Sequence, residues 1–176
     1  MIKHKPLPPL KELSKCLYLD STSPSGLRWA KYCGGRSRKN KIAGTKRVDG
    51  YWNVGLKKHL YLAHRITCYL KTGVDPGALW VDHINLKTNN LSIRHATPGQ
   101  NHANRIKVRY KKGRESSSIY KGVYKHTKNK NWIARINVNK KLKHIGVFET
   151  EIEAALAYNR AALELWGEFA RLNEIE

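Results

Sequence analysis

An aspartate and histidine pair, Asp82-His83, is the part of this sequence best suited to chemistry. It follows Trp80 and Val81, an apolar pair that predicts a short strand. A carboxylate can ligate a hard metal ion, and a neutral imidazole beside it can accept a proton near pH 7. Because the pair is also compatible with an ordinary turn at a strand end, its interpretation depends on the residues that follow.

A helix is predicted to begin at Pro98, shortly after this pair. Thr97 suits the N-cap, proline suits the first helical position, and Gln100 completes a capping box. Asn101 then lies in the first turns, where its carboxamide oxygen can ligate a metal ion. A polar loop over residues 85–92 joins the strand to the helix. The sequence therefore predicts a small hard-metal site, with a base beside it.

The elements before this site are predicted from apolar patterning and turn residues. Residues 50–64 predict a β-hairpin with a basic tip, and residues 63–70 predict a helix that Gly73 ends. We therefore expect one domain over residues 50–106. Residues 1–49 are expected to form an irregular basic N-terminal region.

A second small domain is predicted over residues 119–173, after a basic linker over residues 107–118. Three strands should precede a helix that begins with a capping box at Thr150. Five apolar residues at helical spacing are expected to pack this helix on the sheet: Ile152, Ala155, Leu156, Leu163 and Trp166. The fold class is therefore α+β, with a C-terminal three-stranded antiparallel sheet packed on one helix.

The other face of this sheet is expected to be exposed and basic. Residues alternate along the central strand, so Trp132, Ala134, Ile136 and Val138 share one face, opposite Ile133, Arg135 and Asn137. The basic residues expected on the exposed face are Lys121, Lys125, Arg135, Lys143 and His144. A basic three-stranded face is suited to reading a DNA groove.

The whole chain is strongly basic, with a net charge of +21 over 176 residues. This charge favours a polyanionic partner, first of all double-stranded DNA. No long apolar run or basic amphipathic helix favours a membrane. The N-terminus lacks the apolar region of a signal peptide, and the spacing of the three cysteines indicates neither a zinc motif nor a disulfide framework. We therefore expect a cytoplasmic protein.

Residues from about Gly50 to Arg105 resemble an HNH endonuclease of the phage and homing type. The resemblance rests on Tyr61-Leu62-Ala63-His64-Arg65, on Val81-Asp82-His83-Ile84-Asn85, and on Ile93-Arg94 with Ala96-Thr97-Pro98 and Gln100-Asn101. It implies an N-terminal ββα-metal nuclease domain. A phage-encoded enzyme of this kind would act in the cytoplasm of the host bacterium.

The resemblance also implies a role for each candidate residue. Asp82 and Asn101 would hold one Mg²⁺ or another divalent ion such as Mn²⁺. His83 would be the general base that takes a proton from the attacking water. Hydrolysis of a DNA phosphodiester in this way would leave a 3′-hydroxyl and a 5′-phosphate.

One position departs from the family pattern. The middle asparagine of the family, which orients the histidine, corresponds here to Ser92, and the preceding loop is shorter than usual. Asn89 or Asn90 is expected to supply the missing group, and we favour Asn90 as the second catalytic residue. His64 also matches a family position; we interpret it as structural, with a place near the metal site as the alternative.

Residues 119–173 resemble the Apetala-2/ethylene-response-factor DNA-binding domain. The resemblance rests on Tyr120-Lys121-Gly122-Val123, Trp132-Ile133-Ala134-Arg135-Ile136, Ile145-Gly146-Val147-Phe148, and Gly167 with Ala170-Arg171-Leu172-Asn173. In phage and mobile-element proteins the two modules occur fused in this order. The expected DNA-binding residues are Lys121, Tyr124, His126, Arg135, Asn137, Lys143, His144 and, from the first domain, Arg105.

Two functions remain open from the sequence. The first is a metal-dependent DNA endonuclease, acting as a monomer that nicks or as a dimer that forms on DNA. The second is a sequence-specific DNA-binding protein or regulator that keeps a degenerate, inactive HNH site. An RNA-binding protein is disfavoured, because the sequence shows no exposed-aromatic motif of the usual RNA-binding modules.

Overall fold

A computed structural model describes residues 5–85, 91–111 and 113–175. The chain forms two compact units, Met1–Thr97 and Pro98–Glu176. This division differs from the expected boundaries in two ways. Residues 1–49 belong to the same unit as the hairpin and helix that follow them, and the helix at Pro98 belongs to the second unit.

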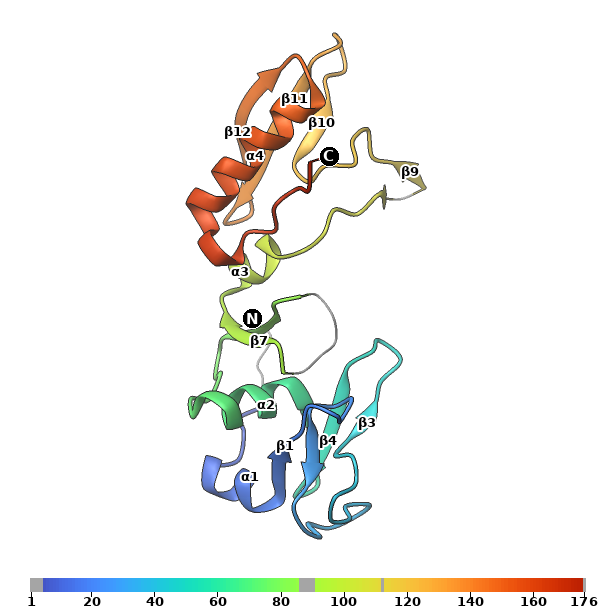
Figure 1. Cartoon of the computed structure of the whole chain (residues 1–176), viewed down its shortest axis with the longest axis vertical. Helices are drawn as coiled ribbons and strands as arrows, with labels where there is room; N and C mark the ends of the chain where they lie inside the picture. The colour runs from blue at the N-terminus through green and yellow to red at the C-terminus, as the bar shows by residue number, and fades with distance from the viewer. Residues whose placement is uncertain (1–4, 86–90, 112, 176) are drawn as a thin grey trace. The chain divides into compact units, whose positions relative to one another are not determined.

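The first unit combines two helices with three small antiparallel sheets (Figure 1). Its strands pair as β1 with β2, as β3–β4–β5 and as β6 with β7. The elements are α1 (Leu10–Cys16), β1 (Leu17–Leu19), β2 (Leu27–Trp29), β3 (Thr45–Lys46), β4 (Trp52–Leu56), β5 (His59–Leu62), α2 (Ala63–Thr72), β6 (Trp80–His83) and β7 (Ile93–Ala96). The predicted hairpin, helix and strand are confirmed.

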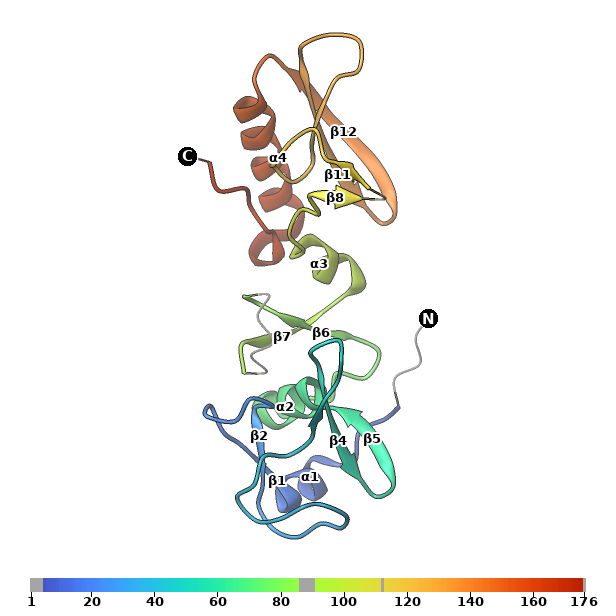
Figure 2. The same cartoon turned by 90° about the vertical axis from the view of Figure 1, so that its right-hand side faces the viewer.

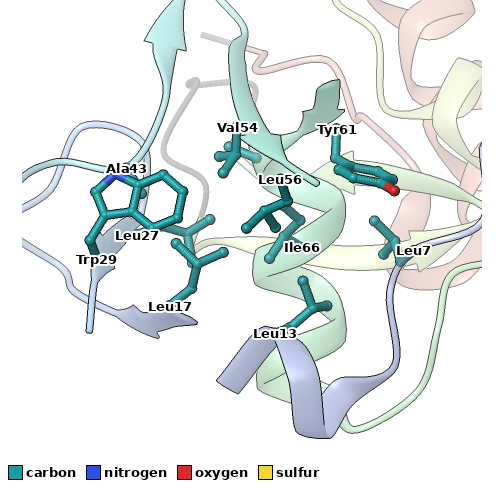
Figure 3. Packing of buried hydrophobic residues seen from close by; sticks show 11 residues of the cluster. Leu7, Leu13, Leu17, Leu27, Trp29, Ala43, Val54, Leu56, Tyr61 and Ile66 are labelled. Carbon is teal, nitrogen blue, oxygen red and sulfur yellow. The ribbon is translucent and has the colours of Figure 1, made fainter. Parts of the chain in front are cut away.

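The core of this unit is built from residues on both sides of the expected boundary at residue 50. Leu13 and Leu17 from the N-terminal region belong to one cluster with Val54, Leu56 and Ile66 (Figure 3). All five side chains are buried, so their packing stabilises both segments together. The N-terminal region is therefore part of the fold that supports the candidate site.

The ends of α2 follow from its sequence. Gly73 closes the helix in the left-handed region at φ 73°, and its N–H donates to the carbonyl of Tyr69. The first six residues of α2 are buried, including His64 and Arg65. A polar pair at such a buried position indicates a role in fixing neighbouring elements.

One covalent link corrects an expectation. A disulfide bond joins Cys16 to Cys33, although the spacing of the cysteines did not indicate a disulfide framework. The two residues are far apart in the sequence but close in the fold, which spacing alone does not reveal. Cys68 is a buried free thiol, and burial raises its pKa to about 11.

The second unit is a three-stranded antiparallel sheet with a long helix along one face (Figure 2). The predicted sheet and helix are confirmed, and a short hairpin lies within the expected linker. The elements are α3 (Pro98–Ala103), β8 (Tyr110–Lys111), β9 (Arg114–Glu115), β10 (Val123–Lys125), β11 (Trp132–Val138), β12 (Lys141–Phe148), α4 (Glu151–Trp166) and the 3-10 turn η1 (Gly167–Phe169).

The helix α4 begins as predicted but packs through different residues. Thr150 and Glu153 form both hydrogen bonds of the capping box. The expected contact residues Ile152, Leu156 and Leu163 are 45%, 45% and 56% exposed. Ala155 is buried as expected, together with Ala154, Ala157, Tyr158 and Ala162, and Trp166 packs against the core. Small alanine side chains allow the sheet to approach the helix closely, so the expected stripe is wrong for Ile152, Leu156 and Leu163.

Two hairpins have turns with unusual backbone angles. Lys57 and Lys58 join β4 to β5, with φ of 48° and 63°. Asn139 and Lys140 join β11 to β12, with φ of 51° and 66°. Positive φ at both central residues is the type I′ geometry that matches the twist of a two-residue hairpin.

Candidate active site and nucleic-acid surface

The hairpin of β6 and β7 places the Asp-His pair in a defined register. Asp82 lies opposite Arg94, and His83 lies opposite Ile93. Asp82 is 2% exposed, and Nε of Arg94 donates to its Oδ2 at 3.1 Å. A buried carboxylate of this kind is stable only with a charged or hydrogen-bonding partner. Arg94 therefore fixes one oxygen of the carboxylate, a role that the sequence motif did not reveal.

Three rings lie together beside this ion pair. The imidazole centroids of His64 and His83 are 5.3 Å apart, with the rings inclined at 65°. Tyr51 contacts both, with centroid distances of 5.2 Å to His64 and 5.9 Å to His83. The structure thus brings His64 to the candidate base, the placement that the sequence left as the alternative. The sequence signal was the histidine at the second residue of a buried helix.

The helix α2 is attached to the β6–β7 hairpin at several points. Arg65 donates to the carbonyls of Gly77 and Leu79, just before β6, at 2.7 and 2.8 Å. Nζ of Lys71 donates to the carbonyl of Leu91, just before β7, at 2.9 Å. Cys68 packs against the hairpin through Val81 and Ile93, which lie in one buried cluster with it. These contacts hold α2 in a fixed relation to the Asp-His pair.

The other predicted members of the site lie on other segments or outside the described residues. Asn101 lies on α3, which packs with α4 and η1 in the second unit. Ser92 follows the polar loop, and its carbonyl accepts the N–H of Ile84 at 2.9 Å, which extends the β6–β7 pairing by one pair. Asn89 and Asn90 lie outside the described residues, so the role of Asn90 stays a prediction.

The donors fit a hard divalent ion by their chemistry. A carboxylate oxygen of Asp82 and the carboxamide oxygen of Asn101 are ligands that Mg²⁺ accepts, and this ion keeps several waters. Within the residues that the structure describes, no three His, Cys, Asp or Glu side chains cluster as a metal site.

The face of the C-terminal sheet away from α4 is defined by the strand register. Tyr124, Ile133 and Val147 are directly paired in one row across the three strands. Arg135 pairs with His144, and both belong to the same face by alternation from Ile133. Asn137 pairs with Leu142 in the next row. We call this surface the open face; it presents one arginine among aromatic, apolar and amide side chains.

The register corrects part of the predicted basic surface. Lys125 pairs with Trp132 and Lys143 pairs with Ile136, and these two partners pack on the helix side. Both lysines therefore lie on the helix side at the edge strands, although they were expected on the open face. Lys143 was assigned to the wrong face because a β-bulge between Ala134 and Arg135 shifts the register.

Two lysines of the second unit are held by backbone carbonyls instead of facing solvent. Nζ of Lys121 donates to the carbonyl of Ala103. Nζ of Lys107 donates to the carbonyls of Tyr120 and Val123 and lies 4.9 Å from the centre of the Tyr124 ring. Burial lowers the pKa of each ammonium to about 8. Lys121 is thus less available to a phosphate than the sequence suggested.

The remaining predicted contact residues are at the margins of this unit. His126 follows β10, and its Nδ1 accepts the N–H of Lys128 at 3.1 Å. Arg105 follows α3 and is exposed. His102, on α3, has a pKa lowered by burial and by the charges of Arg105 and Lys121. None of these facts assigns a DNA contact, so the roles of His126 and Arg105 stay predictions.

Comparison with known proteins supports one half of the resemblance. The chain is 38% identical over 107 residues to an uncharacterised HNH endonuclease of Acanthamoeba polyphaga mimivirus. The match covers 59% of this chain and 52% of that protein, so the chain spans about half the length of the curated relative it matches. No protein-family model matches the sequence. The similarity concerns a protein named as an HNH endonuclease, the first of the two families that the sequence resembles.

The comparison does not extend to every expectation. The likeness of the C-terminal unit to the Apetala-2 domain stays a prediction, although its sheet and helix have the expected order. Among residues 5–85, 91–111 and 113–175, no helix combines the length and the apolar character that a membrane span requires.

Proposed function

We propose that this chain is a metal-dependent DNA endonuclease of the HNH type, which hydrolyses a phosphodiester to a 3′-hydroxyl and a 5′-phosphate. The observation that carries the proposal is the Asp82-His83 pair at the end of β6, held opposite β7. The similarity to a protein named as an HNH endonuclease supports the same function.

Each residue has a distinct task in the proposed reaction. His83 accepts the proton of the attacking water, because it is the imidazole adjacent to the proposed metal ligand. Asp82 and Asn101 would hold the divalent ion, and Arg94 would keep the Asp82 carboxylate oriented through its hydrogen bond to Oδ2. The bound ion supplies neutralisation of the charge that develops on the phosphate and the leaving oxygen.

The open face of the C-terminal sheet is the proposed surface for double-stranded DNA. Arg135 can bind guanine or phosphate through its planar fork, and Asn137 can bind adenine. Tyr124, Val147 and Leu142 are 44%, 47% and 57% exposed on this face and offer apolar contact to thymine methyl groups. The net charge of +21 provides the sequence-independent part of the affinity.

A DNA-binding regulator with an inactive nuclease site is the second candidate. Ser92 at the family's asparagine position and the engagement of Asp82 by Arg94 favour it. It predicts that binding survives while cleavage is absent with either Mg²⁺ or Mn²⁺.

Nicking of supercoiled plasmid DNA by the full chain separates the two functions. The wild-type protein is expected to convert plasmid to the open-circular form with Mg²⁺ and to stop when EDTA removes the ion. His83→Ala is expected to lose at least about 100-fold in rate while DNA affinity by gel shift changes little. Equal cleavage by His83→Ala would exclude this residue as the base. Wild-type protein that binds but never cleaves would establish the regulator.

A further inference from the structure

We propose that His64 and Tyr51 are positioning residues for the proposed base His83, and that they fix its imidazole through ring packing. This inference rests on the proposed function, since it assigns a support to the same active site. It differs from the expectation that an asparagine of the polar loop performs this task alone.

The first support is the mutual contact of the three rings. His64 meets His83 edge to face at 5.3 Å between centroids. Tyr51 is tilted against His64 and His83 at 56° and 58°. Edge-to-face and tilted pairs at these distances are attractive, and they restrict the rotation of both partners. His83 therefore touches two rings that come from two different elements.

The second support is that the start of α2, which carries His64, is held in place by hydrogen bonds. It is 7% exposed and follows Ala63 at the start of α2. Its neighbour Arg65 donates to the carbonyls of Gly77 and Leu79, which precede β6. A displacement of His64 relative to His83 would have to break these two hydrogen bonds. Arg65 thus fixes the separation that the ring contact needs.

Tyr51 is fixed by its own turn. Its backbone N–H donates to Oδ1 of Asp49 at 3.3 Å, and its carbonyl accepts the N–H of Arg47 at 2.7 Å. Arg47 also forms an ion pair with Asp49 at 2.8 Å. Tyr51 is 39% exposed, so its ring contacts the two buried or half-buried histidines from a position that solvent still reaches.

The need for such a support follows from Ser92. A serine side chain is shorter than the amide that the family uses to orient the base. Ring contacts from α2 and from the turn before β4 can supply orientation in its place. Catalytic rates depend steeply on such orientation, because displacement of a reacting group by about 1 Å can cost about 100-fold.

The test compares three variants of the full chain in single-turnover plasmid cleavage with saturating DNA and Mg²⁺. His64→Ala is expected to lower the cleavage rate about tenfold or more, with DNA affinity within about twofold. His64→Phe keeps an aromatic ring and is expected to restore most of the rate. His59→Ala is the matched control, since His59 makes a ring contact with Tyr61 at 6.4 Å in the same unit but outside the cluster.

The double variant His64→Ala with His83→Ala shows whether His64 acts through the base. It is expected to be no slower than His83→Ala alone. The inference is overturned if His64→Ala cleaves at the wild-type rate, if His64→Phe is as impaired as His64→Ala, or if the two losses add fully. Loss of rate in Asn90→Ala without loss in His64→Ala would assign the support to the loop.

A nuclear magnetic resonance measurement keeps the inference testable if the wild-type protein proves inactive. The Cε1–H resonance of His83 is expected to show a ring-current shift that His64→Ala and Tyr51→Leu change and His59→Ala leaves in place. An unchanged His83 resonance in both cluster variants would overturn the inference. Absence of cleavage with the expected resonance changes would contradict only the proposed nuclease function.

Discussion

At the residue scale, the Asp82 carboxylate combines deep burial with one guanidinium partner. Arg94 itself has a side chain only 14% exposed, so the pair is shielded from water on both sides. Removing one partner of such a buried pair weakens the hydrogen bonding of the charge that stays behind, which costs more than removing both. The pair therefore fixes the carboxylate that we propose as a metal ligand.

Arg94→Ala is expected to lower the free energy of unfolding of the first unit by roughly 2 kcal/mol, because the buried carboxylate of Asp82 loses the charge-assisted hydrogen bond from Nε of Arg94. The double variant Asp82→Ala with Arg94→Ala should recover part of this loss. Urea unfolding of the four proteins of the cycle measures both effects. A loss for Arg94→Ala below about 0.5 kcal/mol would show that the pair contributes little.

At the element scale, the backbone just before β10 approaches α4 closely at Gly122. Gly122 has φ of 78°, and a Cβ added there would come within 2.0 Å of the Tyr158 ring and 2.6 Å of the Arg135 carbonyl. The hydroxyl of Tyr158 is shielded enough that burial raises its pKa to about 12. The close contact of sheet and helix thus depends on a missing side chain.

Gly122→Ala is expected to destabilise the second unit by roughly 3–5 kcal/mol, since it combines strain with overlap against a ring and a carbonyl. Gly113→Ala is the matched control. Gly113 has a similar φ of 76°, but a Cβ there meets nothing within 4 Å. This control should cost only about 1–2 kcal/mol, the strain of the left-handed backbone. Equal thermal unfolding of the two variants would contradict the role of the contact.

The sequence predicted the elements well and their contacts less well. The end of α2 at Gly73 and the capping box of α4 at Thr150 were predictable, because each depends on residues close together in the sequence. The residues through which α4 packs were only partly predictable, because hydrophobic spacing does not reveal that alanines contact the sheet. The disulfide between Cys16 and Cys33 is likewise a long-range fact.

The candidate site shows the same limit. The Asp-His pair and its strand were found from local sequence, and the family resemblance supplied their roles. The register opposite Arg94 and the contact with His64 depend on how β7 and α2 pack, which local patterns do not determine. The bulge after Ala134 shifted the pairing of the strands, which the alternation rule for strands does not anticipate.

At the scale of the whole molecule, the dominant quantity is a net charge of +21. Repulsion among so many like charges destabilises the compact state, and it increases affinity for a polyanion. Lys107 and Lys121 make the stability of the second unit depend on pH, because burial disfavours their charged forms and lowers their pKa. Nearby charges modify this effect, as Glu151 raises the pKa of Lys107 and Arg171 lowers that of Lys121.

Stability of the second unit is therefore expected to rise between pH 8 and pH 10. The folded lysines lose their protons near pH 8, whereas the unfolded chain keeps them to about 10.5, so the unfolded state binds more protons in this window. Above pH 10 the raised pKa of Tyr158 reverses the trend. Urea unfolding from pH 7 to 11 should show a maximum near pH 10.

The control for this prediction is the double variant Lys107→Met with Lys121→Met. It removes the two specific ionisations but leaves most of the general charge repulsion. Its stability should change less between pH 8 and pH 10, by on the order of 1 kcal/mol per lysine. A decrease in wild-type stability over this window would contradict the assignment.

The two type I′ hairpin turns carry positive charge at strained backbone positions. Glycine is the residue that positive φ favours, yet lysines stand at Lys57, Lys58 and Lys140. Each such residue costs about 1 kcal/mol in backbone strain. In return, the tips of two hairpins extend positive charge away from the body of each unit, which enlarges the distance over which a polyanion is attracted. The same three lysines therefore carry both a backbone cost and an electrostatic contribution.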